Sequence, residues 1–402
     1  MGKLPVLVLN SGSSSIKFSI YEAGAGEPEK LLEGAVDGIG AAGLGSFWVK
    51  DASGEKIVNE APELPNAATA FALVAEALNR DGFPHPAAIG HRMVCGGPTV
   101  TENQFLTPEL IDEMERYTAF APLHTPIAVF IMRQALKLFP GVPNFVCLDS
   151  YFHRNLPEVT RHLPIPPKYA GMGVRRFGAH GISYESIVHA LEPNVPKRLI
   201  VAHLGNGASI SAVKDGSGVE TSMGLTPTGG IISGTRTGDI DPGVLIFILR
   251  DLLASGRSGD EAADLLEKAA SKQSGLLGVS ELTNDMRGLR EAIGSGNAKA
   301  RLAVDEFVYA IRKFIGAYIA VLGGLDMLVF TGGIGENDSA SRAEICAGLE
   351  CFGIQVDAER NNCLGEAVIS AEGSPVTVRV IPPAEDLIIV NHVRRLLDGS
   401  GK

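Results

Sequence analysis

The chain has 402 residues, 45% of them hydrophobic and 20% charged, and a formal net charge of −11 at pH 7. A single compact core does not usually reach this length, so we expect two domains. The acidic balance and the lack of a run of lysine and arginine argue against nucleic acid as the main partner, because neutralising a phosphate backbone requires clustered basic residues. A small phosphate ligand is not excluded, since it needs only a few local donors.

The cysteines and the apolar segments bear on the compartment. The five cysteines are scattered and form no CxxC pair, which favours a reducing compartment and argues against a zinc site; they are Cys95, Cys147, Cys346, Cys351 and Cys363. The first residues lead directly into a predicted strand, so we expect no signal peptide. The longest apolar helix candidate, 303–326, carries Asp305, Glu306, Arg312 and Lys313 and is expected to be a buried helix, not a membrane span. We therefore expect a cytoplasmic protein with no membrane partner.

Apolar periodicity, with breaks rich in glycine and proline, predicts alternating strands and helices. The first part is predicted to contain a strand, a turn and a strand over 5–21, helices over 66–80, 108–118 and 126–138, and strands over 87–94 and 144–150. The second part, from near 150, is predicted to contain a hairpin over 199–214, a loop rich in glycine and threonine over 224–243, helices over 243–255, 259–270 and 298–322, a strand from 327 that leads into "FTGGIGEN", and a last helix over 384–397. This alternation predicts an α/β architecture.

Two predicted hairpins have the same unusual turn. In "VLVLNSGSSSIKFSIYE" an apolar strand breaks at Asn10, passes through small polar residues and resumes at Ile16; in "LIVAHLGNGASISAVKDG" a second strand breaks after His203. Glycine and serine allow backbone N–H groups to approach an anion closely. Neither segment is a GxxxxGK[ST] loop. An ordinary polar turn explains one such segment better, but its recurrence favours two phosphate-binding hairpins.

Two arginines lie in glycine-rich surroundings, Arg92 in "GHRMVCGG" and Arg236 in "GTRTGDIDPG". A guanidinium group can donate two parallel hydrogen bonds to phosphate or carboxylate oxygens, which indicates an anion site. The alternative is an ion pair with a local acid, and for Arg236 the nearby Asp239 keeps that alternative open.

Three further polar residues have both a functional and a structural interpretation. His180 lies between small residues in "RRFGAHG", where a lone histidine is more often structural. Asp149 ends a predicted strand, so it could hold a metal ion or form a turn. Glu385 begins the last helix, where capping is favoured from the residues alone.

The segment "FTGGIGEN" follows a predicted strand and precedes a predicted helix. It does not have the spacing of a dinucleotide fingerprint, but a strand-to-helix turn of this kind can receive a nucleotide on its backbone.

Taken in order, the motifs resemble the acetokinase (acetate kinase) family. The matching segments are "LNSGSSSIKF", "GHRMVCGG", "APLHTP", "LDSYFH", "RRFGAHGIS", "HLGNGAS", "TSMGLTP", "GTRTGDIDPG", "SGLLGVS", "TNDMR", "FTGGIGEN" and "PAEDL". The resemblance implies two domains of the duplicated actin-like, sugar-kinase-like (ribonuclease H-like) ATPase fold with a central cleft, and a homodimer. It places one domain at 1–150 plus 386–402, with a returning C-terminal helix, and a nucleotide-binding domain at 151–385.

The resemblance also implies roles for individual residues. Its phosphate-side motif matches Asn10, Ser13, Ser15 and Lys17, with Lys17 on the nucleotide. Its active-site arginines match Arg92 and Arg236. Asp149 matches a catalytic residue and, with Glu385, the acidic pair tied to magnesium; Asn10 and Glu385 match the Mg²⁺ (or Mn²⁺) site. His180 and Arg236 match transition-state stabilisers, and His124 matches the histidine of "APLH". The nucleotide residues match His203, Gly205, Asn206, Gly207, Asp285, Met286, Arg287, Gly333, Ile334, Gly335 and Asn337, and the acyl-pocket residues match Arg92, Val94, Leu123 and Pro227.

The implied reaction is reversible Mg²⁺-dependent transfer of a phosphoryl group from ATP to acetate, in line and without a covalent intermediate. Ala179 stands where the family usually has an aromatic residue, and the space it leaves favours propionate or a larger acid by about 0.8 kcal/mol per buried methylene. Cys95, Pro98, Thr125 and Tyr184 also depart from the family pattern.

Two other functions remain open: a sugar kinase on the same fold, and a nucleotide-binding protein without activity. The two arginines favour an anionic acceptor over a sugar hydroxyl. The presence of Arg92, Asp149, His180, Arg236 and Glu385 argues against loss of activity.

Overall fold

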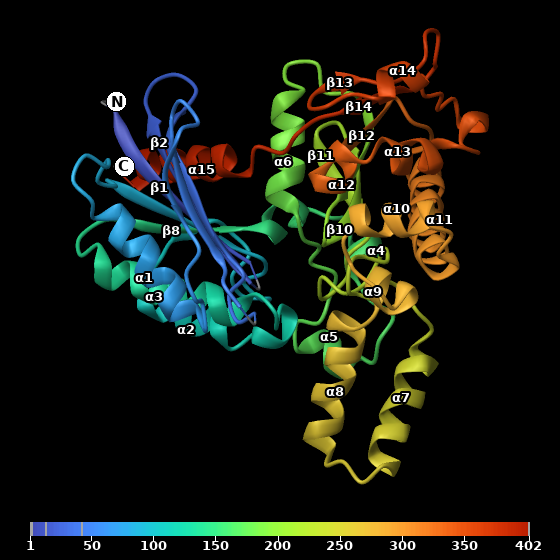
Figure 1. Ribbon diagram of the computed structural model, residues 1–402, viewed down its shortest axis with the longest axis horizontal. Helices are drawn as coiled ribbons and strands as arrows, with labels where there is room; N and C mark the ends of the chain where they lie inside the picture. The colour runs from blue at the N-terminus through green and yellow to red at the C-terminus, as the bar shows by residue number, and fades with distance from the viewer. Residues whose placement is uncertain (1–2, 13, 42, 401–402) are drawn as a thin grey trace. The chain divides into compact units, whose positions relative to one another are not determined.

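A computed structural model describes residues 3–12, 14–41 and 43–400, in two compact units (Figure 1). Unit 1 comprises Met1–Tyr151 together with Ala384–Lys402, and unit 2 comprises Phe152–Pro383. Glu385 therefore belongs to unit 1, whereas the sequence analysis placed it at the end of the second domain. Ser13, one of the phosphate-side residues implied by the resemblance, lies outside the described residues.

Unit 1 is built on an eight-stranded sheet with the order β5-β4-β3-β2-β1-β6-β8-β7. Its strands are β1 (Leu4–Ser11), β2 (Ser15–Ala23), β3 (Glu29–Asp37), β4 (Ser46–Asp51), β5 (Lys56–Glu60), β6 (Ala88–Met93), β7 (Gln104–Phe105) and β8 (Asn144–Leu148). The first five form an antiparallel meander, whereas β1, β6 and β8 run parallel. The strands β3, β4 and β5 were not predicted from the sequence.

Helices cover both faces of this sheet: α1 (Ala67–Leu78) and α3 (Thr125–Leu138) cover one, and α15 (Glu385–Ser400) the other (Figure 1). Successive strand residues face opposite sides, so Leu7 and Leu9 pack with Phe71 and Ile131 on the α1 and α3 side. On the α15 side a Cβ added to Gly90 would lie 2.5 Å from Ile389, which shows how closely α15 approaches β6. A further helix, α2 (Pro108–Glu115), packs against α3.

Unit 2 repeats the same arrangement in a six-stranded sheet with the order β11-β10-β9-β12-β14-β13. Its strands are β9 (Arg198–Leu204), β10 (Ala208–Lys214), β11 (Ser217–Thr221), β12 (Met327–Thr331), β13 (Ala367–Val368) and β14 (Thr377–Val380). As in unit 1, the first three strands are antiparallel; β9 also runs parallel to β12, and β12 runs parallel to β14. The prediction of a duplicated actin-like ATPase fold is confirmed.

Two helices enclose the sheet of unit 2. Ile200 and Ala202 belong to the core that includes Phe307 on α11 (Ala298–Leu322), whereas Val201 packs with Ile187 on α6 (Gly181–Ala190). Period-two alternation along β9 therefore sends neighbouring side chains into different cores. The other helices are α4 (Glu158–Arg161), α5 (Pro167–Gly171), α7 (Pro242–Ala254), α8 (Gly259–Lys272), α9 (Gly275–Ser280), α10 (Met286–Gly294), α12 (Gly332–Asn337), α13 (Ser339–Cys346) and α14 (Ala358–Asn361).

The predicted helices near 66–80, 126–138 and 298–322 are confirmed by α1, α3 and α11, with ends shifted by a few residues. The glycine motif after β12 differs, because "GGIGEN" forms the short helix α12 itself. The strand ends at Thr331 since Gly332 has φ +76°, and an added Cβ there would lie 2.8 Å from the Leu204 carbonyl oxygen. A side chain at 332 would thus meet both backbone strain and a steric clash.

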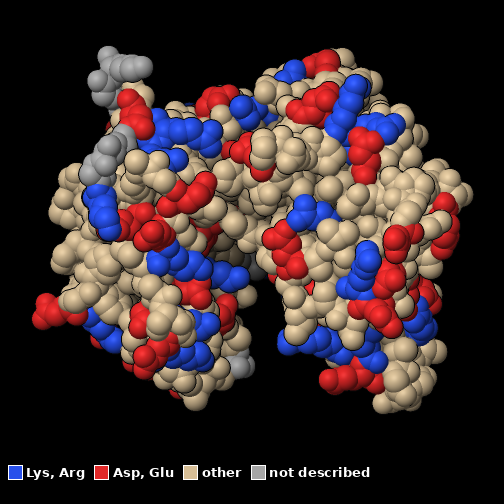
Figure 2. Space-filling view, turned by 90° about the horizontal axis from the view of Figure 1, so that it is seen from above, with Lys and Arg blue, Asp and Glu red and all other residues tan. Residues whose placement is uncertain are grey.

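Acidic and basic side chains are interspersed on the face drawn in Figure 2. Some form local ion pairs, as where Arg133 Nη2 lies 2.7 Å from both Asp112 Oδ1 and Glu115 Oε2. Exposed pairs of this kind contribute little to stability. Within the described ranges, no helix is both long and apolar enough to cross a membrane.

Candidate active site

In unit 1, three polar residues meet where parallel strands end. Asn10 is near the end of β1, Arg92 near the end of β6, and Asp149 directly after β8. Arg92 donates from Nε and Nη2 to Asp149 Oδ2 at 3.1 and 2.7 Å, and from Nη1 to Asn10 Oδ1 at 3.0 Å. The carboxyl ends of parallel strands share one edge of a sheet, which explains why residues so distant in the chain meet.

Glu385, the first residue of α15, joins this cluster. Its Oε2 atom accepts a hydrogen bond from Asn10 Nδ2 at 3.5 Å and lies 3.9 Å from Arg92 Nη1. Burial alone would lower the pKa of Arg92, but the charges of Asp149 and then Glu385 outweigh it, so the pKa is raised. Arg92 is therefore a fixed positive charge between two carboxylates, and we call these four residues the Arg92 cluster.

A buried contact holds the start of α15 beside β2. Ser19 Oγ donates to Asp386 Oδ2 at 2.7 Å, and burial raises the pKa of this carboxyl group. Ser19 and Lys17 are two residues apart on β2 and lie on the same face of the sheet, with Lys17 exposed and paired in register with Asn10. The contact between Ser19 and Asp386 fixes the residue next to Glu385. Sequence reasoning missed it, because both residues have ordinary surface alternatives.

The oxygen atoms of the Arg92 cluster suit a magnesium ion. Magnesium takes hard oxygen ligands and typically binds one or two carboxylates together with substrate phosphates. Asp149, which is fully buried, and Glu385 supply two carboxylates, and Asn10 supplies an amide oxygen. Over the described residues, no group of three or more His, Cys, Asp or Glu side chains could hold a metal ion by itself. The donor set therefore fits an ion that arrives with a phosphate ligand.

In unit 2 the turn between β9 and β10 consists of Gly205, Asn206 and Gly207. Asn206 Oδ1 accepts a hydrogen bond from Asn284 Nδ2 at 2.8 Å, and a Cβ added to Gly234 would collide with the same oxygen. Two separate loops therefore fix the turn that the sequence predicted as a phosphate-binding hairpin.

Two histidines stack beside this turn. The rings of His180 and His203 have centroids 4.2 Å apart and planes inclined by 24°. His180 directly precedes α6 with a left-handed backbone (φ 56°), and His203 is in β9. Ser209 Oγ lies 2.8 Å from His180 Nδ1, and Ser183 Oγ lies 2.8 Å from His203 Nδ1.

Arg236 approaches the same turn. A Cβ added to Gly207 would lie 3.1 Å from Arg236 Nη1 and 3.4 Å from His180 Nε2, so both groups flank the backbone of Gly207. Arg236 Nη1 donates to the Pro227 carbonyl oxygen at 3.3 Å, whereas Asp239 Oδ1 accepts from the N–H of Gly230 at 2.7 Å.

The structure shows no ion pair between Arg236 and Asp239, the alternative that the sequence left open. Burial alone lowers the pKa of Arg236, which nevertheless stays charged at neutral pH. Among the described residues, no carboxylate contributes to the pKa shift of Arg236, so its charge is not neutralised.

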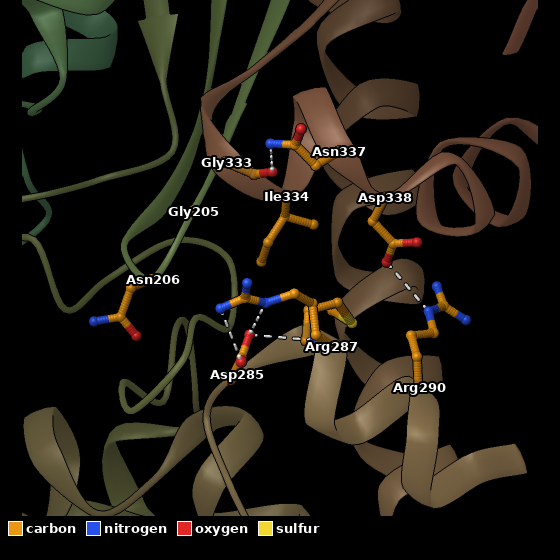
Figure 3. Close-up of a pocket in the computed structure, with 10 residues that line it drawn as sticks. Gly205, Asn206, Asp285, Arg287, Arg290, Gly333, Ile334, Asn337 and Asp338 are labelled. Atoms are coloured by element: carbon orange, nitrogen blue, oxygen red, sulfur yellow. Dashed lines mark hydrogen bonds and ion pairs between the residues drawn. The ribbon is translucent and has the colours of Figure 1, made fainter. Parts of the chain in front are cut away.

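Unit 2 also contains a pocket of about 540 Å³ (Figure 3). Eight of its lining residues were predicted to bind nucleotide: Gly205, Asn206, Asp285, Met286, Arg287, Gly333, Ile334 and Asn337. Asp285 caps α10 by accepting from the N–H of Arg287 at 3.2 Å, and Asn337 Nδ2 donates to the Gly333 carbonyl at 2.9 Å. The pocket is therefore formed by the N-terminal end of α10, the helix α12 and the β9–β10 turn.

Two lining residues were missed. Arg290 Nε donates to Asp338 Oδ2 at 3.2 Å (Figure 3). Its Nη2 donates to Glu344 Oε2 at 2.7 Å. Arg290 follows Asp285 by a little more than one helical turn, and this spacing was the one available signal. Conversely, Gly335 does not line the pocket: it is buried, and an added Cβ would lie 3.4 Å from the Phe330 backbone.

The model of the Acetokinase family matches residues 5–391. The chain belongs to the acetokinase family. An acetate kinase of Phocaeicola vulgatus is 38% identical, covering 98% of this chain and 100% of the relative. The predicted enzyme class, a kinase that transfers a phosphoryl group to a carboxylate, is confirmed, and the family uses ATP.

Two solved structures share the fold. The Porphyromonas gingivalis acetate kinase has a TM-score of 0.83 at 37% identity, and a propionate kinase of Francisella tularensis has 0.87 at 32%. Each comparison covers 98% of this chain and 100% of the solved chain.

The residues that the acetokinase resemblance assigned to the acyl pocket belong to different units. Val94 is buried after β6, where its carbonyl accepts from the N–H of Ser150 at 3.2 Å, and Leu123 is half-buried before α3. Pro227 and Ala179 are in unit 2, and the Ala179 carbonyl lies 3.2 Å from His153 Nε2.

The departures from the acetokinase pattern are mostly buried. Cys95 is buried, and its Sγ accepts from the N–H of Gly97 at 3.4 Å. Thr125 is buried at the start of α3, directly after the half-buried His124, and Pro98 is half-buried. Tyr184 is fully buried on α6, and its hydroxyl lies 2.5 Å from Ser209 Oγ.

Proposed function

We propose that the chain catalyses reversible, Mg²⁺-dependent transfer of the γ-phosphoryl group from ATP to acetate, giving ADP and acetyl phosphate in one in-line step. The observation that carries this proposal is the Arg92 cluster, in which a buried guanidinium is held by Asp149, Asn10 and Glu385. Such a cluster suits an anionic acceptor beside a metal-bound phosphate. The acetate kinases at 37% and 38% identity support acetate as that acceptor.

A carboxylate needs no general base, because it is already ionised at neutral pH. The difficulty is electrostatic, since one anion must approach another. Arg92 would orient the carboxylate, and Arg236, whose charge is not neutralised, would offset the charge on the phosphoryl group. His180 would donate from Nε2 to an equatorial phosphoryl oxygen, because this atom faces Gly207 together with Arg236 Nη1.

Asp149, Glu385 and Asn10 would hold the magnesium ion, which when bound would neutralise part of the charge on the ATP phosphates. The pocket of unit 2 would take the adenosine part of ATP, between Ile334 and Arg287. The β9–β10 turn would supply backbone N–H groups to the phosphates. Lys17, which is exposed on β2, would add a positive charge there.

A longer acid is the second candidate substrate. Ala179 is small, and a propionate kinase has the same fold at 32% identity. The test is a hydroxamate assay, in which hydroxylamine traps the acyl phosphate, with MgATP and formate, acetate, propionate, butyrate or isobutyrate. The highest kcat/KM with acetate supports the proposal, and a maximum at propionate or beyond supports the wider pocket. Nucleotide binding without turnover of any acid would contradict both and indicate a non-catalytic binding protein.

We also propose a cytoplasmic homodimer. The cysteines form no disulfide among the described residues, which supports a reducing compartment. Apolar side chains exposed on α7, including Ile246 at 51% and Phe247 at 73%, support a protein contact there. Light scattering of the purified protein tests the dimer, and a monomer at micromolar concentration would contradict it.

A further inference from the structure

A line of three hydrogen-bonding groups leads from the core of unit 2 to His180. Tyr184 is fully buried on α6, and its hydroxyl oxygen lies 2.5 Å from Ser209 Oγ. Ser209 is also fully buried, on β10, and its Oγ lies 2.8 Å from His180 Nδ1. The backbone N–H of Tyr184 donates to the carbonyl oxygen of His180 at 3.0 Å, so the first turn of α6 brings the two residues together. The serine hydroxyl thus joins the phenol to the imidazole.

The chemistry of these groups favours one direction for the two hydrogens. A phenol is a stronger acid than an alcohol, so the Tyr184 O–H is expected to donate to Ser209 Oγ. The single hydrogen of Ser209 is then directed to His180 Nδ1, which must accept it. A neutral imidazole that accepts at Nδ1 carries its proton on Nε2. Burial strengthens both bonds, because water does not compete for them.

The direction matters because of where Nε2 lies. Nε2 of His180 faces the backbone of Gly207 beside Arg236 Nη1, as the added Cβ at Gly207 shows. A protonated Nε2 can donate to a phosphoryl oxygen there, whereas the opposite tautomer would present a lone pair to an anion.

We propose that Tyr184 and Ser209 are positioning residues that hold His180 in the Nε2–H tautomer, so that it donates to the phosphoryl group during transfer. This inference rests on the proposed function, because it gives a purpose to the proton on Nε2. It also gives a role to Tyr184, which departs from the family pattern.

The stacked histidine beside His180 is held in a matching way. Ser183, which is buried on α6, lies 2.8 Å from His203 Nδ1, so each of the two rings has its Nδ1 within hydrogen-bonding distance of a buried serine. Ser183 on α6 contacts the His203 ring of β9, and Ser209 on β10 contacts the His180 ring that precedes α6. This crossed arrangement fixes both ring planes, whose stacking leaves little freedom to rotate.

The experiment measures tautomers and turnover separately. The full-length protein is labelled with ¹⁵N-histidine, the signals of His180 are assigned among the nine histidines with a His180→Asn variant, and the two ring nitrogens are distinguished by their chemical shifts. In the unmodified protein we expect the proton on Nε2. In Tyr184→Phe we expect a mixture of tautomers, a kcat about tenfold lower and a KM for ATP changed less than twofold. Ser209→Ala should behave similarly, and the double variant should be no slower than Ser209→Ala alone.

A matched control is Tyr318→Phe, which removes the hydroxyl of another buried tyrosine of unit 2, on α11, and should leave both kcat and the His180 signals unchanged. Protonation of His180 at Nδ1 in the unmodified protein would overturn the proposal. A lower kcat in Tyr184→Phe with unchanged His180 signals would also overturn it, because Tyr184 would then act through packing alone. The NMR readout needs no turnover, so it distinguishes a wrong tautomer from a wrong proposed function, which inactivity of the unmodified protein would reveal.

Discussion

Removing Arg92 is expected to destabilise unit 1 as well as stop the reaction. Asp149 has no exposed surface, and its Oδ2 lies 2.7 Å from Arg92 Nη2, whose side chain is 18% exposed. Arg92→Ala leaves a charged carboxylate buried without its guanidinium, and breaking a buried pair in this way costs about 3–5 kcal/mol of unfolding free energy. The double variant Arg92→Ala/Asp149→Ala removes the stranded charge and should be less destabilised than the sum of the single variants, by about 1–3 kcal/mol.

The chain provides a local probe for this measurement. Its single tryptophan, Trp48, is in β4, so its fluorescence during urea unfolding reports on unit 1. The matched control is Arg133→Ala, which breaks ion pairs of the same unit on the surface, where the partners are 64% and 48% exposed. This control should lose less than about 1 kcal/mol. A loss for Arg92→Ala no larger than that of the control would refute the reasoning, because Asp149 could then not be a buried charge held by Arg92.

Three further predictions concern the site and its supports. Gly207→Ala should lower kcat, because the added methyl group displaces the ends of Arg236 and His180 by a few tenths of an ångström; the loss should stay below the roughly 100-fold that a displacement of about 1 Å costs. Gly224→Ala, with open space around it, is the control, and equal kcat values would contradict the geometry. Ile334→Arg, which fills the pocket, should raise the KM for ATP at least tenfold and leave the KM for the carboxylate unchanged; a parallel rise in both would place the carboxylate in the same pocket. Burial lowers the pKa of His91 to about 4, so the folded state binds fewer protons than the unfolded state. The free energy of unfolding of unit 1 should therefore fall by about 3 kcal/mol as the pH drops from 6.5 to 4. Trp48 fluorescence should show a smaller loss in His91→Gln, and an equal loss in both proteins would contradict the prediction.

The glycine-rich turn between β9 and β10 could be predicted from the sequence, because glycines between two apolar runs rarely have a role other than forming a turn. Asn206 and Gly207 lie in a hairpin turn, as the interruption between two apolar runs indicated. Resemblance to the acetokinase family extended this to eight residues of the pocket, since the order of motifs carries information that no single motif has. Arg92 and Asp149 meet for a general reason, because both end parallel strands of one sheet.

Other features depend on contacts that sequence reasoning cannot supply. The strand β3 contains Gly34, and a glycine in a sequence usually indicates the end of a strand. Here the Phe18 ring occupies the space that a side chain at position 34 would need. The left-handed backbone of His180 is uncommon for a residue other than glycine, and the sequence around it did not indicate this conformation. Ser209 looks like an ordinary strand residue, and its place beside Tyr184 follows only from the packing of α6 on the sheet.

The division of the chain affects how the protein is made. Unit 1 begins with β1 and is completed by α15, which packs against β6 at Gly90, and all of Phe152–Pro383 is synthesised in between. A ribosome that adds about 5–20 residues per second needs on the order of ten to fifty seconds for that stretch. Unit 2 is continuous in the chain and can fold as it emerges, whereas the sheet of unit 1 lacks α15 on one face until synthesis ends. Chaperones that bind nascent chains therefore have a defined target, the α15 face of β1 and β6, and translation that stops before Glu385 yields a folded unit 2 beside an incomplete unit 1.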